Sequence, residues 1–292
     1  MTLTRRRFLT ISAACLAAAP GHAATARWQG QAMGAEVSIT LKGPEAVTAP
    51  ALVEARAMIR RIEAEFSLYD AGSALSRLNR TGRLDRPSTL FLELMEASDG
   101  VHRATGGLFD PTVQPLWQAI AAGRDPDAAR AAVGWDRVHF DPGAVTLGQG
   151  QALTLNGIAQ GFATDCIARL LDARGLGDTL VNMGEFRGRG GPWRIGLADP
   201  TFGLMGTRSL RNGAIATSSP AAMLSDNGGH ILHPGHTTKW STVSVEAEDA
   251  TTADGFSTAF CLSPIDVIRG AAGRHGIRRI TLIDTAGDLT TL

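Results

Sequence analysis

The chain has 292 residues, of which 44% are hydrophobic and 19% are charged, and this balance excludes a disordered polypeptide. Its 28 Lys and Arg residues match its 28 Asp and Glu residues, so no excess of positive charge favours nucleic acid as a partner. No apolar run reaches the roughly 20 residues that a membrane-spanning helix needs, so we expect no transmembrane segment.

The first 26 residues are typical of an export signal. Three adjacent arginines at positions 5–7 precede Phe8-Leu9 and an apolar run over 11–19, after which small residues follow. The arginine pair resembles the twin-arginine type of signal, which addresses folded proteins across the bacterial inner membrane. Small residues satisfy a signal peptidase both at Ala23 and at Ala26. We therefore expect a twin-arginine signal peptide over 1–26, a single mature domain over 27–292, and a periplasmic location.

Two cysteines remain after the signal, Cys166 and Cys261, and each lies in an apolar helical pattern. Neither belongs to a CxxC motif or a Cys/His cluster. Buried thiols are expected, although an oxidising compartment also permits a disulfide between them.

The first half of the mature chain alternates strand and helix patterns. Apolar periodicity assigns each element, and glycine, proline or helix-capping residues set its ends. The predicted elements are strands over 35–41, 137–140 and 152–155, helices over 51–66, 89–105 and 158–174, and a short helical insertion starting at Pro126.

The second half contains a glycine-rich stretch, 184–191, which is either a cradle for a phosphate or ring or a plain hairpin. Strands and helices mix without a strict βαβ rhythm, so the predicted fold class is α+β. The predicted elements are strands over 179–183, 193–197, 214–217, 241–245 and 279–283, and helices over 253–262 and 265–273.

Asp254 and Thr258 place two hard oxygen ligands four positions apart. On a helix they share one face, with Cβ atoms roughly 5 to 6 Å apart. An oxygen set suits Mg2+ better than zinc. A structural alternative stays open, because Thr251 followed by Asp254 also resembles a capping pair at a helix start.

Two other patterns allow chemistry without specifying it. The turn at Asn156-Gly157 leads into a helix and would aim backbone N–H groups at an anion, but it lacks the Lys-Ser/Thr pair of a phosphate-binding loop, so a plain helix start is an equal alternative. Three histidines at 230, 233 and 236 match no closed zinc site. One of them acting as a proton acceptor fits the pattern better.

Several segments, in order, resemble the signatures of the ApbE family of FAD:protein FMN transferases. The likeness covers roughly residues 33–282 and rests on several matches in the same order. The segments are Met33-Gly34, Ser67-Leu68-Tyr69, residues 73–79, the Phe109-Asp110-Pro111-Thr112-Val113 signature within 106–113, residues 156–165, and Ala253-Asp254-Gly255-Phe256-Ser257-Thr258-Ala259.

The resemblance implies an ApbE-like fold of two mixed α/β lobes with FAD between them. It also implies Mg2+ on the FAD pyrophosphate, bound by Asp254, Thr258 and the backbone carbonyl of Gly157, with His230 and Asp254 as the catalytic residues and His230 as the candidate base. The implied flavin or adenine contacts are Met33, Tyr69, Phe109, Asp110, Thr154, Gln160, Thr217, Ser218 and Ile231.

In the implied reaction, a Thr or Ser hydroxyl of a partner attacks the FMN-side phosphorus and AMP leaves. The implied partner is an FMN-acceptor domain of a membrane-associated redox protein. The chain departs from the family at Thr154 and Gln160, where Asp and Lys are common, and at Gly184-Glu185-Phe186, where Gly-Gly-Asp is common. This pattern is similar to the NosX group, which accompanies nitrous oxide reductase maturation. A non-catalytic exported FAD-binding accessory protein is therefore an alternative, as is a plain exported binding domain.

Overall fold

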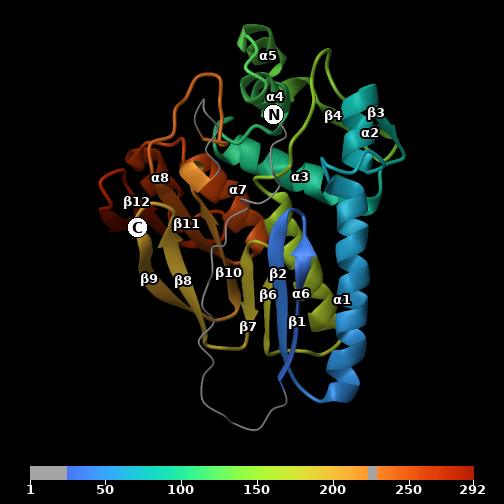
Figure 1. Ribbon diagram of the computed structural model, residues 1–292, viewed down its shortest axis with the longest axis vertical. Helices are drawn as coiled ribbons and strands as arrows, with labels where there is room; N and C mark the ends of the chain where they lie inside the picture. Colours follow the sequence, from blue (N-terminus) through green and yellow to red (C-terminus); the bar gives the residue numbers. More distant parts are fainter. Residues whose placement is uncertain (1–24, 223–228) are drawn as a thin grey trace.

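The computed structural model describes residues 25–222 and 229–292. Its strands form one eight-stranded sheet, a three-stranded sheet and a two-stranded hairpin, and helices pack beside them (Figure 1). This confirms the predicted α+β class. No helix in these two ranges is long and apolar enough to cross a membrane.

The large sheet is antiparallel throughout, in the order β1-β2-β6-β7-β10-β11-β12-β13. Its central strands are almost wholly buried, which explains their apolar composition. The strands are β1 (Thr25–Ala32), β2 (Ala35–Lys42), β6 (Thr179–Asn182), β7 (Phe186–Arg189), β10 (Gly213–Ser218), β11 (Thr242–Ala247), β12 (Ile277–Ile283) and β13 (Leu289–Thr291).

The two faces of the central strands contact different layers, because successive side chains point to opposite faces. Val181 and Ala216 belong to the main core, which the helices cover. Their neighbours Leu180 and Ile215 belong to a second, smaller core that the β8–β9 hairpin covers. The hairpin consists of β8 (Trp193–Asp199) and β9 (Gly203–Leu210) and lies between β7 and β10 in sequence.

Three aromatic side chains join the helices of the main core. Phe66 lies 5.5 Å from Phe91 and 5.9 Å from Phe162, measured between ring centroids, and these residues come from three different helices. Figure 1 shows the long α1 standing beside α6, with α3 crossing above them. The helices are α1 (Glu45–Phe66), α3 (Thr89–Ala104), α6 (Ala159–Ala173), α7 (Ala250–Phe260) and α8 (Ile265–Ala271).

A group of short elements extends the molecule beyond α3, at the top of Figure 1. The three-stranded sheet there has the order β3-β5-β4. The elements are α2 (Ala74–Thr81), β3 (Arg83–Asp85), α4 (Gln114–Ala121), α5 (Asp127–Ala132), β4 (His139–Phe140) and β5 (Ala144–Thr146), with 3-10 turns at Pro111–Val113, Trp135–Arg137 and, elsewhere, Pro220–Ala222.

The strand predicted over 152–155 is wrong, because side-chain and loop groups take the hydrogen bonds that a ladder would use. The Asn79 amide accepts the Leu153 N–H at 2.7 Å and donates to the Leu153 carbonyl at 2.8 Å. The Thr154 N–H donates to the Pro111 carbonyl at 2.8 Å. The segment therefore approaches α6 as an irregular connection.

The helix predicted from residue 51 begins earlier, at Glu45, and includes Pro50. Pro50 is the sixth residue of this helix and has no N–H, so the hydrogen bond to the Ala46 carbonyl is missing. The glycine-rich stretch over 184–191 begins with a hairpin turn, one of the two alternatives that the sequence left open, and continues into β7, a strand that was not predicted. Gly184 lies in this turn with a φ of 110°, a conformation that favours glycine.

Candidate active site at the junction of α6 and α7

The start of α6 meets the second turn of α7 at a glycine. A Cβ at Gly161 would lie 2.2 Å from the Ala250 carbonyl oxygen and 2.7 Å from the Asp254 Cβ, so no side chain fits there. The close approach allows Asp254 Oδ2 to accept the Gly161 N–H at 2.9 Å. Asp254 therefore caps the neighbouring helix α6.

The predicted pairing of Thr251 with Asp254 as a cap for their own helix is wrong. Helix α7 begins at Ala250, and its N-terminal cap is Asp249, whose side chain accepts the Thr252 N–H at 2.7 Å. Thr251 donates its backbone N–H to Asp165 Oδ2 at 2.8 Å instead. The helix starts one turn before the predicted boundary, which places Asp254 inside it.

The three predicted metal ligands are brought together at this junction. The Thr258 hydroxyl donates to the Gly157 carbonyl oxygen at 3.2 Å, and Thr258 follows Asp254 by one helical turn. A Cβ at Gly157 would lie 2.9 Å from the Thr258 Cγ2 atom, so the close approach needs glycine. Ser218, at the end of β10, places its hydroxyl 3.3 Å from that of Thr258 and 2.7 Å from that of Ser257.

A second buried carboxylate, Glu185, lies at the same place and was not among the predicted site residues. Its side chain extends from the β6–β7 turn, and Oε2 accepts the Thr217 N–H at 2.9 Å. Glu185 is 7% exposed and Asp254 is 3% exposed. The sequence pointed to Glu185 only as the carboxylate of Gly184-Glu185-Phe186, the segment where the family commonly has Gly-Gly-Asp.

The two carboxyl groups are poorly stabilised as anions. Burial raises the pKa of Asp254 to about 7, although the Gly161 N–H opposes the rise. Burial and the nearby charge of Asp254 raise the pKa of Glu185 well above its usual value. Within residues 25–222 and 229–292, neither carboxylate forms an ion pair with Lys, Arg or His. This donor set, hard oxygens without a basic partner, fits a divalent cation such as Mg2+.

The two positions that depart from the family pattern make separate contacts. The Gln160 side chain packs on the β6–β7 turn, where a Cβ at Gly184 would lie only 2.6 Å from its amide carbon. The Thr154 hydroxyl accepts the Asn156 N–H at 3.3 Å, inside the loop that precedes α6. Gln160 thus packs against Gly184, the residue that precedes Glu185, whereas the Thr154 hydroxyl holds the loop that leads into α6.

The other predicted flavin contacts are spread over several parts of the fold. Thr217 and Ser218 lie at the junction itself. Met33, at a φ of 51° in the β1–β2 turn, donates its N–H to Glu63 Oε1 at 3.0 Å. Tyr69 is 72% exposed, whereas Phe109 and Ile231 are buried in the main core. Asp110 caps the turn over Pro111–Val113 by accepting the Thr112 N–H at 2.8 Å.

His230, the candidate base, is mostly buried beside the 3-10 turn at Pro220–Ala222. Burial lowers its pKa, and the Pro220 carbonyl acts in the opposite direction. Its Nδ1 atom is buried and has no hydrogen-bond partner in the described part of the chain. The rings of His233 and His236 lie 4.8 Å apart. In the described ranges, no three His, Cys, Asp or Glu side chains form a group that could hold a metal, so the histidines provide no zinc site.

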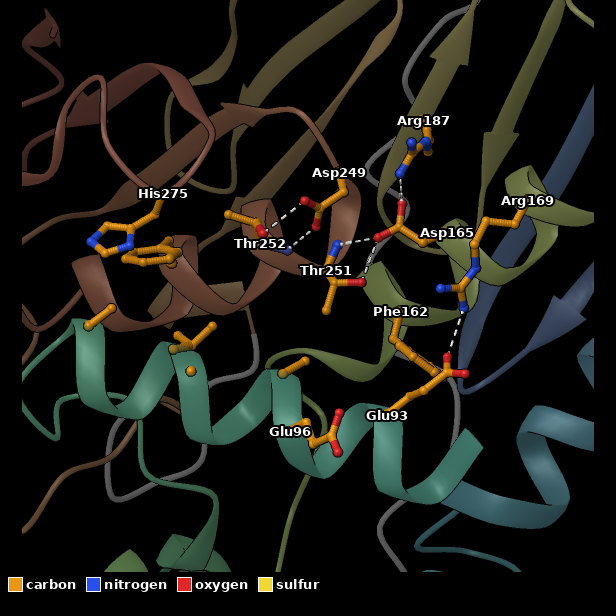
Figure 2. Close-up of a pocket in the computed structure, with 15 residues that line it drawn as sticks. Glu93, Glu96, Phe162, Asp165, Arg169, Arg187, Asp249, Thr251, Thr252 and His275 are labelled. Carbon is orange, nitrogen blue, oxygen red and sulfur yellow. Dashed lines mark hydrogen bonds and ion pairs between the residues drawn. The ribbon is translucent and has the colours of Figure 1, made fainter. Parts of the chain in front are cut away.

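A groove of about 790 Å³ lies between α3 and the first turns of α7, and no predicted site residue lines it (Figure 2). Its lining includes Thr252 and Phe256, which point about 200° around α7 from Asp254. In the groove wall, Asp165 accepts the Ala250 N–H at 3.0 Å and pairs with Arg187. The hydrogen bonds from the Ala250 and Thr251 N–H groups to Asp165 fix the start of α7, so this wall of the groove also supports the junction.

Comparison with known proteins agrees with the predicted resemblance. A family model described as the ApbE family matches residues 33–280. A protein of Haemophilus influenzae named FAD:protein FMN transferase is 26% identical over 278 residues, covering 82% of this chain and 80% of its own length. The flavin transferase ApbE from Vibrio cholerae superposes with a TM-score of 0.80 at 22% identity, covering 93% of this chain and 97% of that structure. The ApbE protein of Thermotoga maritima gives 0.82 at 24% identity, covering 91% and 96%. The chain belongs to the ApbE family.

Proposed function

We propose that the chain is an FAD:protein FMN transferase with FAD as its substrate. In this reaction a Thr or Ser hydroxyl of an acceptor protein attacks the FMN-side phosphorus, its proton passes to a base, and AMP leaves. The family membership and the names of the relatives support the class of reaction. The observation that carries the proposal is the convergence of the Gly157 carbonyl, Asp254 and Thr258 at the start of α6.

The junction suits a phosphoryl group because a helix N-terminus favours negative charge. Gly157 and Gly161 keep the helix start free of side chains and allow α7 to approach it closely. Asp254, Thr258 and the Gly157 carbonyl would hold Mg2+, which when bound neutralises charge on the phosphoryl oxygens. The protein's own contribution is to position the pyrophosphate for an in-line displacement.

His230 is the proposed base. Its lowered pKa keeps the imidazole neutral at neutral pH, and the neutral ring is the form that accepts a proton. The unpartnered Nδ1 atom supports this role, because no group of the described residues uses its capacity for a hydrogen bond.

The second candidate is an exported FAD-binding accessory protein without transferase activity, of the kind that assists nitrous oxide reductase maturation. The neutral Gln160 amide against Gly184 favours it, because a flavin would meet no positive charge from that side chain. The two candidates share the FAD site and differ only in turnover.

The proposed location is the periplasm, after export through a twin-arginine signal. The predicted signal covers residues 1–26, of which 1–24 lie outside the described residues. Thr25 and Ala26, which pair with Lys42 and Leu41 in β1 and β2, support cleavage after Ala23, since the later cut would remove both residues. The proposed partner is an FMN-acceptor domain of a membrane-associated redox protein exposed to that compartment.

Intact-mass analysis tests transfer directly. The mature protein, FAD and Mg2+ are incubated with an FMN-acceptor domain that contains one target hydroxyl. A transferase leaves the acceptor heavier by one FMN less one water and releases AMP. An unchanged acceptor mass, with FAD bound tightly, would instead support the accessory protein. An acceptor whose target residue is replaced by Ala serves as the control.

A further inference from the structure

The proposed Mg2+ site contains one carboxylate, Asp254, yet a second buried carboxylate lies beside it without a stated role. We propose that Glu185 supplies the second carboxylate of this chain's cation site, so that Glu185 and Asp254 bind the cation together. This inference rests on the proposed function, because it adds a residue to the same site.

A series of hydrogen-bond contacts links Glu185 to the other residues of the proposed cation site. Its Oε2 atom accepts the Thr217 N–H at 2.9 Å, and the next residue, Ser218, has its hydroxyl 3.3 Å from the Thr258 hydroxyl. Thr258 in turn donates to the Gly157 carbonyl at 3.2 Å. The end of β10 therefore joins Glu185 to two of the three proposed ligands.

Each of the two carboxylates has one oxygen engaged and one available. Asp254 Oδ2 accepts the Gly161 N–H, and Glu185 Oε2 accepts the Thr217 N–H. Their other oxygens receive no hydrogen bond from the described residues, although an ionised carboxylate offers about four acceptor positions. Two oxygens, one from each side chain, are thus left for a ligand.

Charge considerations indicate that this ligand is a cation. Two acidic side chains that are both more than nine-tenths buried repel each other when ionised, and burial removes the water that would screen them. Arg187, two residues after Glu185 in the chain, is bound to Asp165. Mg2+ is commonly bound by one or two carboxylates together with substrate phosphates, which this arrangement provides.

A purely structural role for Glu185 makes a different prediction. If its purpose were to accept the Thr217 N–H, glutamine would serve equally well, because the amide oxygen accepts the same bond. Glu185→Gln removes only the charge. The substitution therefore separates cation binding from support of the β10 end.

Titration calorimetry with MgCl2 on the mature protein, without flavin, measures the effect. We expect Glu185→Gln to weaken Mg2+ binding at least tenfold. The melting temperature of this variant without Mg2+ should equal or exceed that of the wild type, because the repulsion between the two buried carboxylates is removed. Glu96→Gln, an exposed acid on α3, is the matched control and should bind Mg2+ as the wild type does. Glu185→Asp, which keeps the charge but shortens the side chain, should also bind more weakly and serves if the glutamine variant does not fold.

Two results would overturn the proposal, and they are distinguishable. If Glu185→Gln and Glu185→Asp bind Mg2+ as tightly as the wild type while Asp254→Asn does not, Glu185 has no part in the site and the proposed function stands. If Asp254→Asn also binds normally, the proposed cation site is wrong, and the role of Glu185 fails with it.

Discussion

At the scale of single residues, Asp254 shows that a capping role and a binding role are compatible. One of its oxygens caps α6 through the Gly161 N–H, and the other receives no hydrogen bond from the described residues. The cap fixes the carboxylate direction, because the hydrogen bond orients the group against a rigid helix start. A ligand oxygen held in this way needs little reorganisation when a cation binds.

Replacing Gln160 by Lys tests the departure from the family pattern. The side chain packs against Gly184, next to Glu185, so a lysine ammonium would lie near the two buried acids and act as their counter-charge. We expect Gln160→Lys to weaken Mg2+ binding severalfold and to leave FMN transfer unchanged or slower, measured by calorimetry and acceptor mass. Gln118→Lys, on the exposed face of α4, is the control. A severalfold faster transfer would show that the neutral amide is a defect.

Cys166 gives a pH prediction. The structure confirms that Cys166 and Cys261 are free and buried. Burial raises the pKa of the Cys166 thiol to about 11, although Arg169 opposes the rise. A raised folded pKa means that the neutral thiol contributes stability below about pH 8.5, the ordinary thiol value, and that this contribution is lost as the pH rises toward 11.

The measurement is alkylation by iodoacetamide, read at the Cys166 peptide by mass spectrometry. At pH 8 the native protein should react far more slowly than the urea-unfolded chain, because the thiolate is the reacting form. The native rate should increase steeply between pH 9 and pH 11. Equal rates in native and unfolded protein at pH 8 would contradict the burial of this thiol.

At the scale of elements, the crossing of α6 and α7 decides whether the site exists. Gly161 permits the contact because the Ala250 carbonyl and the Asp254 Cβ occupy the position of a side chain. We expect Gly161→Ala to push the helices apart, with a cost of about 1 to 3 kcal/mol in the free energy of unfolding. Mg2+ binding should weaken in parallel, because the Asp254 cap is lost.

Gly100 provides the matched control within a helix. It is exposed in the middle of α3, and a Cβ there would meet nothing within 4 Å. Gly100→Ala should therefore stabilise the protein by up to about 1 kcal/mol, in line with helix propensity. Urea unfolding followed by circular dichroism measures both variants. Equal stability changes in the two would mean that α6 and α7 are not in close contact.

The elements also show where prediction from sequence succeeds. Apolar periodicity identified α3 and α6 to within a residue or two, because each buries one face in the main core. Periodicity did not identify β9, whose exposed and half-exposed residues lack a clean alternation of apolar and polar types. The segment over 152–155 looked like a strand, but the Asn79 amide replaces the ladder partner, and such a contact between distant residues leaves no local pattern.

For the site, the sequence predicted the residues proposed to hold the cation, but not the contacts that surround them. Asp254, Thr258 and Gly157 were found through signature segments, and the structure brings them together. Glu185 was missed because its significance depends on β7 and β10 lying side by side, which places its carboxylate at the Thr217 N–H. Contacts across a sheet of this kind cannot be read from spacing along the chain.

At the scale of the whole molecule, the edge strand β1 bears on the proposed export. It pairs with β2 from Thr25 onward, so a chain cut after Ala23 keeps the whole strand. If the protein is exported as proposed, we expect the form purified from the periplasm to have the mass of a chain cut after Ala23. A recombinant chain starting at Arg27 should unfold at a lower temperature than one starting at Thr25, because two strand pairs are missing. Equal melting temperatures would show that these pairs contribute nothing to stability.

The proposed function and the proposed role of Glu185 both require a cation and FAD to meet at the α6–α7 junction, and anomalous diffraction tests this most directly. The protein is crystallised with FAD and with Mn2+ in place of Mg2+, and the manganese is located from its anomalous signal. We expect a peak enclosed by Asp254, Thr258, the Gly157 carbonyl and Glu185, in contact with the FAD pyrophosphate. A peak in the groove between α3 and α7, or FAD bound with no manganese at the junction, would contradict it.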